Sequence, residues 1–341
     1  MKYENYEQGP IRPPSEAESI LIRTTRNCTW NKCKFCTLYK GEKFSVRTVE
    51  EIKNDIDIMA ETGYFDHCSS AFLQDANSIV LSTDKTEEIL LYLRAKFPGI
   101  NRVTTYGRAD TLSIITIEEY KKLFAAGLNR IHSGYESGSD IVLNLINKGN
   151  TKAQEIEAGK RIKESGIQFS VYFMPGVGGK EHSEENYKET GDVINQVNPD
   201  FVRIRTFVPI EGSGLQQDID TGVFTECTDI EKAMEIKHLI ETVNQCDGKI
   251  VSDHIINLFE NVKGNLKKDK NKLIDIFNNF EALPPLNQQE FQIARRMGLV
   301  KSVKDMRNLS LEQKTHIQKL MGYSNEYGFE IFLKELLRRY I

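Results

Sequence analysis

The stretch that decides the fold is Cys28-Thr-Trp-Asn-Lys-Cys33-Lys-Phe35-Cys36, which follows the apolar run Ser19-Ile-Leu-Ile. Its three cysteines have the spacing C-x4-C-x2-C. Thiolates are soft ligands that suit iron–sulfur clusters, and such a cluster usually takes four protein ligands. Three ligands would leave one iron open to an exogenous molecule, and an open coordination position is typical of a catalytic metal. The stretch therefore predicts a catalytic cluster held by Cys28, Cys33 and Cys36.

The same stretch resembles the cluster loop of the radical S-adenosylmethionine (SAM) enzymes. In that family three cysteines hold a [4Fe–4S] cluster, and the amino and carboxylate groups of SAM occupy the fourth iron. The usual family spacing is C-x3-C-x2-C with an aromatic residue before the last cysteine. Phe35 fills the aromatic position, and the first gap is one residue longer here. The resemblance implies that SAM is cleaved reductively to a 5′-deoxyadenosyl radical, which abstracts hydrogen from a substrate. It also implies a one-electron donor such as flavodoxin or ferredoxin.

Two other interpretations of the cysteines remain open. Structural zinc usually takes four ligands, whereas Cys68, Cys227 and Cys246 are scattered singly along the chain. The alternatives are a non-catalytic iron–sulfur or zinc-binding protein that transfers electrons on a barrel scaffold, and a barrel enzyme of acid–base chemistry with incidental cysteines. The scattered cysteines also argue against a second cluster.

Composition indicates a soluble globular protein. The 341 residues are 28% charged and 39% hydrophobic, and the formal net charge is −4. We therefore do not expect nucleic acid or an anionic membrane as a partner. No apolar run reaches the length of a membrane span, and the chain begins with polar residues. We expect a cytoplasmic protein with reduced thiols and a small-molecule substrate.

Strand-like and helix-like segments alternate along the first two thirds of the chain. Such alternation predicts a parallel sheet with right-handed crossovers. Thr48 and Glu51 form a capping-box pattern at the start of the first helix, and Gly127 is placed to end a later one. The strand-like segments are 20–25, 71–73, 102–106, 130–133, 169–173 and 201–207.

These repeats fall two short of a closed eight-fold barrel. We predict an α/β fold, a partial (β/α)6 TIM-type barrel with a C-terminal helical extension, which is also the fold that the resemblance implies. The expected divisions are an extended lead-in at 1–18, the barrel at 19–211 and a mainly helical extension at 212–341. A short strand is possible at Lys249-Ile-Val-Ser.

In barrels the active residues follow the carboxyl ends of the strands. The second strand is followed by Asp75 and Asn77, which could contact the amino group of SAM or could simply form a turn. The fifth strand is followed by Gly176 and Gly178, where glycine would permit the backbone to approach the adenine closely. A simple loop is the alternative for these glycines.

The fourth strand runs into His132-Ser-Gly-Tyr-Glu136-Ser-Gly-Ser-Asp140, followed by Lys148-Gly149. This segment resembles G-x-E-S-G-S-D…K-G of one large radical SAM group. The resemblance implies that Glu136 contacts SAM and that Ser133 and Ser137 line its binding site. A Ser or Asp cap of the next helix is compatible with the same residues.

Arg203 and Arg205 share one face of the sixth strand. An arginine at a barrel mouth can grip an anionic group with two parallel hydrogen bonds, although a solvated pair is also possible. We predict a small anionic substrate held partly by Arg205. We expect no cobalamin-binding domain before Cys28. The radical SAM subgroup that the chain most resembles is the one with HemN-like, oxidoreductase-type barrels.

Overall fold

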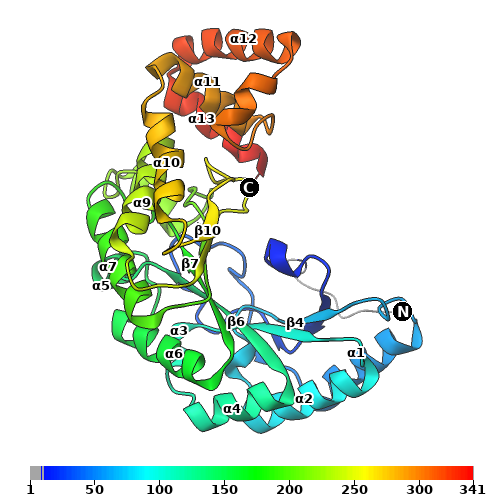
Figure 1. Cartoon of the computed structure of the whole chain (residues 1–341). Helices are drawn as coiled ribbons and strands as arrows, with labels where there is room; N and C mark the ends of the chain where they lie inside the picture. Colours follow the sequence, from blue (N-terminus) through cyan, green and yellow to red (C-terminus); the bar gives the residue numbers. More distant parts are fainter. Residues whose placement is uncertain (1–8, 10, 341) are drawn as a thin grey trace.

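The computed structural model describes residue 9 and residues 11–340. Its main sheet is a parallel wall that curves through the molecule in the order β1-β4-β5-β6-β7-β8-β9-β10 (Figure 1). All neighbours are parallel except β9 and β10. In the described chain β1 and β10 are the open edges, so the wall is a partial barrel. The strands are β1 Ile20–Arg23, β4 Ser70–Gln74, β5 Arg102–Tyr106, β6 Leu128–Glu136, β7 Gln168–Phe173, β8 Phe201–Ile204, β9 Lys249–Val251 and β10 Lys263–Asn265.

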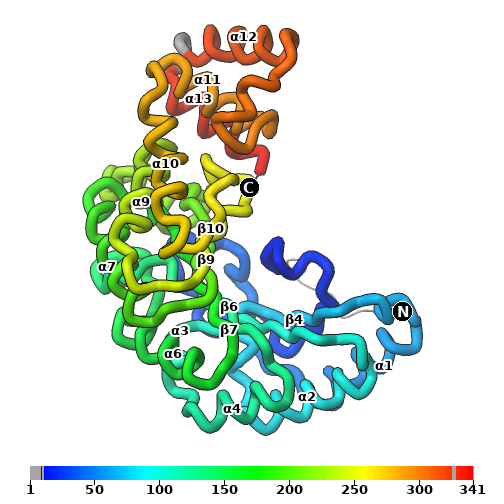
Figure 2. The backbone as a smooth tube through the Cα atoms, in the orientation of Figure 1, coloured from blue at the N-terminus to red at the C-terminus, as the bar shows by residue number. Residues whose placement is uncertain are grey.

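Helices cover the outer face of the sheet and follow one another around it. Neighbouring helices of this layer pack together from α1 to α10 (Figures 1 and 2). The described helices are α1 Val49–Glu61, α2 Thr83–Lys96, α3 Ala109–Leu112, α4 Ile117–Ala126, α5 Asp140–Leu145, α6 Lys152–Ser165, α7 Ser183–Val197, α8 Gly214–Asp220, α9 Asp229–Thr242, α10 Lys270–Glu281, α11 Pro285–Arg296, α12 Leu311–Tyr327 and α13 Phe329–Leu337. Short 3-10 turns lie at η1 Pro14–Glu16, η2 Ser78–Val80, η3 Val303–Asn308 and η4 Arg338–Tyr340. The fold class predicted from the sequence is confirmed.

Alternation along the strands separates an apolar face from a polar one. Outward residues such as Leu73, Ile131 and Val171 are buried in the main core against the helices. Inward residues are aromatic or polar, and the ring of His132 lies 5.9 Å from the rings of both Tyr106 and Tyr172. This alternation of period two gives the barrel a polar interior, which suits a polar ligand.

The N-terminal lead-in enters the barrel interior. The Glu16 carboxylate is fully buried, 3.2 Å from Arg102 Nη2 and 3.5 Å from His132 Nε2. Ser19 Oγ and Ser70 Oγ are 2.8 Å apart. These contacts lie at the amino ends of the strands, so the described part of the lead-in closes the bottom of the barrel. Residues 1–8 and 10 of the expected lead-in lie outside the described residues.

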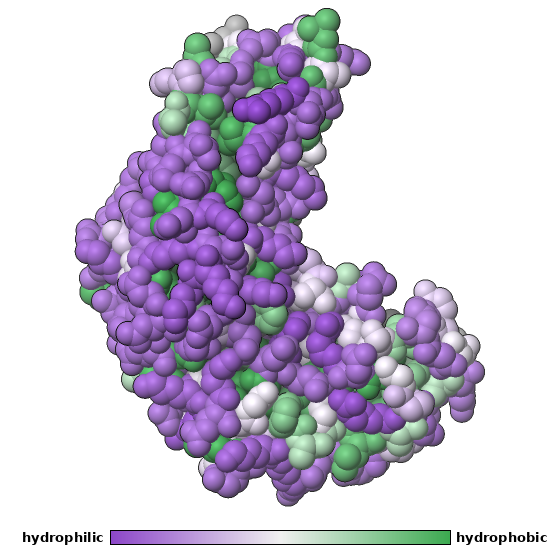
Figure 3. Space-filling model, viewed as in Figure 1, coloured by the Kyte–Doolittle hydropathy of each residue, from purple (hydrophilic) through white to green (hydrophobic). Residues whose placement is uncertain are grey.

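The C-terminal segment contributes to the wall as well as extending beyond it. The suggested strand at 249–252 is present as β9 (Lys249–Val251), which pairs with β8, and α9 packs on α7. The sheet therefore continues past residue 211. Beyond α10, helices α11, α12 and α13 pack on one another at the far end of a crescent-shaped molecule, whose visible face is mostly hydrophilic (Figures 1 and 3).

No helix in the described chain combines the length and the apolar character needed to cross a membrane.

Candidate active site

The cysteine loop follows β1 and lies at the carboxyl ends of the strands. Its two ends are joined by a small two-stranded hairpin. The hairpin pairs β2 Thr25–Arg26 with β3 Ser45–Val46. The Trp30 indole donates to Asn147 O at 2.7 Å, and the Lys34 amide donates to Ile146 O at 2.9 Å. These bonds tie the cysteine loop to the segment that follows α5.

The glycine at 149 is needed for this contact. It has φ +77°, and a Cβ built there would lie 2.4 Å from the Trp30 ring. Both the left-handed backbone and the close approach of the ring favour glycine. The Lys148-Gly149 pair noted in the sequence thus supports the cysteine loop.

The three loop cysteines form a neighbouring set of thiols. Cys33 is buried, and Cys28 and Cys36 are half-buried. Burial raises the pKa of the Cys36 thiol, and Cys33 and Cys28 raise it further. In the described chain no three His, Cys, Asp or Glu side chains are gathered closely enough to hold a metal ion as they stand. The soft thiol set nonetheless fits an iron–sulfur cluster, and cluster assembly would have to draw the sulfurs together.

The remaining cysteines serve the packed core. Cys227 and Cys246 are buried, and Cys246 Sγ lies 3.5 Å from Pro199 O. Burial raises the pKa of Cys227 to about 12 and that of Cys246 to about 11.

Phe35 packs into a small apolar cluster at the top of the barrel, with Val142, Met174 and Val177 among its members. The Lys148 ammonium lies 5.5 Å from the centroid of its ring. This cluster brings the cysteine loop beside the glycine loop that follows β7.

Glu136, the strongest candidate after the cysteines, ends β6 in a buried ion pair. Its Oε1 accepts a hydrogen bond from Lys148 Nζ at 3.0 Å, and both side chains are about nine-tenths buried. Burial lowers the pKa of Lys148, but Glu136 and Cys33 outweigh this effect and leave its pKa raised. Glu136 has φ +65°, and a Cβ at Gly134 would lie 2.3 Å from its Oε1. Gly134 therefore makes room for the carboxylate at the barrel mouth.

The side chains of Asp75 and Asn77 form hydrogen bonds with other residues of the protein. Asp75 Oδ2 accepts from Arg23 Nε at 3.0 Å and from the Asn27 amide at 3.1 Å. The Asn77 amide group donates to Thr29 Oγ1 at 3.1 Å and to a second hydroxyl on α3. Both residues brace the start of the cysteine loop, and contact of either one with SAM stays a prediction.

The two serines differ in placement. Ser133 lies on the opposite face of β6 from His132 and Gly134, fully buried, and its hydroxyl has no hydrogen-bond partner in the described chain. We therefore leave Ser133 out of the proposed cofactor site. Ser137 lies beyond Glu136, and its Oγ accepts from the Ser139 amide at 3.1 Å.

The glycine loop after β7 is a tight turn. Gly176 has φ +84°, and its amide donates to Glu235 Oε2 at 3.0 Å. A Cβ at Gly178 would lie 3.0 Å from His182 O. Glycine at both positions lets this loop pass close to neighbouring protein segments, and its approach to the adenine stays a prediction.

Arg205 follows the last residue of β8 on the same face as Arg203, at the barrel mouth, and it is partly open to solvent. It has no hydrogen bond or ion pair with any described side chain, in contrast to Arg203, which pairs with Asp253 at 3.0 Å. Burial lowers the pKa of Arg205, whereas Tyr172, Glu136 and Tyr106 nearby raise it. Its neighbours are thus the inward residues of β5, β6 and β7.

Two further groups face Arg205. The hydroxyl of Tyr172 is buried, and Tyr106 and Arg205 lie near it. His254, from the loop after β9, has its pKa lowered to about 4 by burial and then by Arg205 and Arg295. The neutral imidazole of His254, the phenol of Tyr172 and the guanidinium of Arg205 therefore lie in the same part of the barrel mouth.

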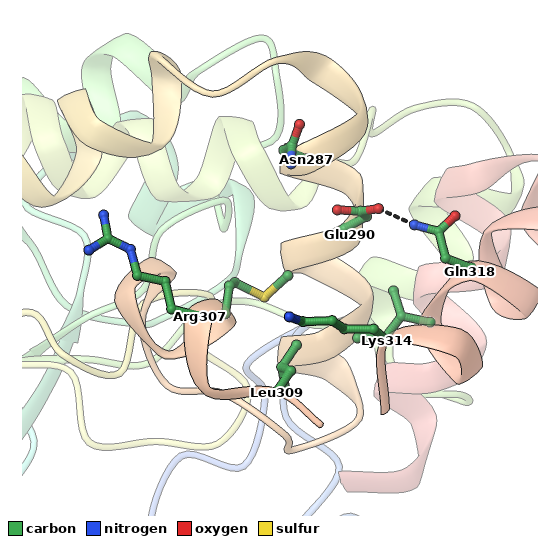
Figure 4. Close-up of a pocket in the computed structure, with 8 residues that line it drawn as sticks. Asn287, Glu290, Arg307, Leu309, Lys314 and Gln318 are labelled. Atoms are coloured by element: carbon green, nitrogen blue, oxygen red, sulfur yellow. Dashed lines mark hydrogen bonds between the residues drawn. The ribbon is translucent and has the colours of Figure 1, made fainter. Parts of the chain in front are cut away.

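A separate surface pocket of about 300 Å³ lies between α11, η3 and α12 (Figure 4). It is lined by Asn287, Glu290, Met306, Arg307, Leu309, Lys314, Ile317 and Gln318. Glu290 accepts a hydrogen bond from Gln318 across it. None of its lining residues comes from a barrel strand, so it is no part of the site at the barrel mouth.

Sequence reasoning missed the roles of Lys148, Trp30 and Glu235. Lys148 stands in the quoted G-x-E-S-G-S-D…K-G segment, so its spacing from Glu136 could have indicated the ion pair. Glu235 lies on an ordinary amphipathic helix, and no local signal marks it.

The chain is also similar in sequence to known proteins. A family model described as "Radical SAM superfamily" matches residues 22–190. A tRNA-2-methylthio-N(6)-dimethylallyladenosine synthase of Syntrophus aciditrophicus is 26% identical over 238 residues, which cover 68% of this chain and 51% of that protein. An uncharacterized methyltransferase of Pyrococcus horikoshii is 25% identical over 228 residues, which cover 64% of this chain and 47% of that protein.

Among solved structures, methylornithine synthase aligns with a TM-score of 0.46 and 16% identity, over 78% of this chain and 82% of that one. The chain spans about half the length of the two curated relatives named above. The fold, the cysteine loop and the matched family agree that residues 22–190 are a domain of the radical SAM superfamily, whose enzymes use a [4Fe–4S] cluster and SAM.

Proposed function

We propose that this enzyme abstracts hydrogen from a small anionic substrate that binds beside Arg205 in the barrel mouth. The observation that carries the proposal is that the Arg205 guanidinium, at the barrel mouth, makes no ion pair with a carboxylate of the described residues, although the Glu136 carboxylate is near enough to raise its pKa. An unpaired guanidinium presents five donors in a fixed fork and favours a carboxylate or phosphate.

The residues of the loops at the barrel mouth would have different roles in binding the cluster and SAM. Cys28, Cys33 and Cys36 would hold the cluster, Phe35 would pack beside it, and the Gly176–Gly178 turn would lie against SAM. When bound, the reduced cluster and SAM supply a 5′-deoxyadenosyl radical. Glu136 and Ser137 at the end of β6 would hold polar groups of SAM, with Lys148 keeping the Glu136 carboxylate in place.

Around the substrate, the chain's task is to bind, orient and exclude water. Arg205 would hold the anionic group, and the buried hydroxyl of Tyr172 would donate to the same group or to its neighbour. Tyr106 and His132 close the interior below them with aromatic rings. The loop after β9, with His254, covers the side next to β8.

The substrate proposal can be tested before the substrate is known. A small-molecule cell extract would be separated into anionic and neutral fractions by anion exchange. Each fraction would be added to anaerobic enzyme with SAM and dithionite, and 5′-deoxyadenosine would be measured. We expect the anionic fraction alone to raise its formation above the basal rate. Stimulation by the neutral fraction alone would contradict the proposal.

Arg205→Ala should keep the basal SAM cleavage and lose the stimulation. Arg307→Ala is the matched control, because Arg307 is an exposed arginine of the C-terminal helices. Equal stimulation of wild type and Arg205→Ala would show that another residue binds the substrate.

The partners follow from the same proposal. We propose that the electron donor is of the flavodoxin or ferredoxin type. We also propose that the enzyme belongs to the HemN-like, oxidoreductase-type group and that its substrate is not a nucleic acid. Some relatives are named for tRNA products. Addition of total tRNA should therefore leave 5′-deoxyadenosine formation unchanged, and stimulation by tRNA would favour an RNA substrate.

A further inference from the structure

Glu235 is a buried carboxylate that the proposed chemistry does not use. It lies on α9, in the C-terminal segment, and only 1% of its surface is exposed. Its carboxylate reaches across to the loop after β7 and to the start of α7. Such a group is costly to bury unless its oxygens are hydrogen-bonded.

Both oxygens of Glu235 are hydrogen-bonded. Oε2 accepts from the Gly176 amide at 3.0 Å and from Asn186 Nδ2 at 2.8 Å. Oε1 accepts from Ser183 Oγ at 2.7 Å. Asn186 Nδ2 also lies 3.3 Å from Met174 O. One carboxylate thus joins α9, the first turns of α7 and the glycine loop.

Among the described residues no cation forms a direct ion pair with Glu235, and neighbouring side chains hold the arrangement instead. Lys232 Nζ pairs with Glu226 at 2.7 Å, and Glu226 pairs in turn with Lys334 of α13 at 2.6 Å. The Lys232 stem covers Gly176, since a Cβ there would meet its Cγ at 2.7 Å. The glycine loop is therefore clamped from the side of the C-terminal helices.

The clamp does not depend on the charge of Glu235. Burial raises its pKa to about 7, against the hydrogen bonds from Gly176, Ser183 and Asn186. In the neutral acid the carbonyl oxygen can still accept from Gly176 and Asn186, while the hydroxyl can donate to Ser183 Oγ. A glutamine can make the same three hydrogen bonds, and a leucine can make none.

We propose that Glu235 is a positioning residue that sets the shape of the SAM-binding glycine loop. The inference rests on the proposed function, because it assumes that residues 174–179 lie against SAM. Without the three hydrogen bonds the Gly176 amide would be buried without its acceptor, which is unfavourable. The glycine loop would then no longer be held in one conformation. SAM affinity should suffer, whereas the cluster, which lies on another loop, should not.

The test compares full-length, anaerobically reconstituted Glu235→Leu and Glu235→Gln. Iron and sulfide content, the SAM dissociation constant by calorimetry and 5′-deoxyadenosine formation at saturating SAM would be measured. We expect Glu235→Leu to weaken SAM binding about tenfold or more with full cluster content and a near-normal rate at saturation. Glu235→Gln should bind SAM like the wild type.

Lys237→Ala is the matched control, because Lys237 lies on the same helix and pairs with Glu281 away from the glycine loop. It should bind SAM like the wild type. If Glu235→Leu does not fold, Ser183→Ala tests the same clamp and should weaken SAM binding severalfold with full cluster content.

Wild-type SAM affinity in Glu235→Leu would overturn the inference, as would wild-type affinity in Ser183→Ala if the leucine variant does not fold. Equal weakening of SAM binding in Glu235→Leu and Glu235→Gln would also overturn it. So would a loss of SAM affinity in Lys237→Ala as large as that in Glu235→Leu. A wild-type enzyme that neither binds nor cleaves SAM would overturn the proposed function as well, which separates the two failures.

Discussion

Asp75 and Asn77 show how far single residues could be interpreted from the sequence. Their position after a strand marked them correctly as residues of the barrel mouth. Which atom each side chain meets depends on segments distant in the chain, because Arg23 and Asn27 bind Asp75 whereas Thr29 binds Asn77. The spacing of residues within a short segment does not indicate partners that are distant in the sequence. For the same reason the sequence did not indicate the role of Glu235.

The cysteines differ in how their loss should act. Cys33→Ala should abolish cluster binding, because only the loop cysteines lie on one segment, whereas Cys246→Ala should retain the cluster with some loss of core packing. Iron and sulfide analysis of the two reconstituted variants decides this. Full cluster loading in Cys33→Ala would rule out the assigned ligands.

Glu136 should be needed for SAM binding and also for stability. In Glu136→Ala a lost charge-assisted hydrogen bond, about 1.5–3 kcal/mol, should weaken SAM binding about tenfold to a hundredfold. The change also leaves Lys148 buried without its partner, which costs about 3–5 kcal/mol.

The second substitution Lys148→Met separates these effects. In the Glu136→Ala/Lys148→Met double variant we expect the free energy of unfolding to recover while SAM affinity stays low. Recovery of SAM affinity in the double variant would mean that Glu136 serves only to neutralise Lys148.

At the scale of elements, the helix ends were the most predictable features. The Thr48 hydroxyl accepts from the Glu51 amide and the Glu51 carboxylate accepts from the Thr48 amide, which is the reciprocal cap that the sequence indicated. The helix ending at Gly127 is likewise confirmed. Caps are local, so a short pattern contains the whole interaction. Strand β10 (Lys263–Asn265) has no apolar alternation and depends on β9, so no pattern could indicate it.

The contact of Trp30 with Gly149 couples two elements of the site. Gly149→Ala should lower the cluster content, because the new methyl group would displace Trp30 and loosen the cysteine loop. Gly212→Ala is the matched control: Gly212 has the same φ of +77° but open space around it. Both variants carry about 1 kcal/mol of backbone strain. Iron content that falls equally in both would show that strain alone is responsible.

At the scale of the whole molecule, the alternation of strands and helices was enough to predict the barrel. The extra strand β9 and the clamp from α9 arise because the C-terminal segment folds back on the barrel, and such long-range contacts leave no periodic signal. The closure of the polar interior by Glu16 also depends on long-range contacts. The sequence of an extended lead-in does not indicate where in the fold that segment lies.

The interior should make stability depend on pH. Burial lowers the pKa of His132 to about 4, against the attraction of Glu16. Because the unfolded chain binds this proton near pH 6.5, the free energy of unfolding should fall as the pH drops from 6.5 to 4, by up to about 3 kcal/mol. Denaturant titrations of the wild type and His132→Phe across this range would check it.

The His132→Phe variant should lose that part of the slope. The control is Phe72→Leu, a neighbouring interior change without a titratable group, which should lower stability equally at each pH. Identical slopes in the wild type and His132→Phe would show that His132 does not titrate in this window.

The most direct test of the central claim is the anaerobic formation of 5′-deoxyadenosine from SAM. The reconstituted enzyme would be incubated with SAM and dithionite, and 5′-deoxyadenosine and methionine would be quantified beside Cys33→Ala. The account predicts equal amounts of both products from the wild type and neither from Cys33→Ala. A wild-type enzyme with a complete, reducible [4Fe–4S] cluster that forms no 5′-deoxyadenosine would contradict it.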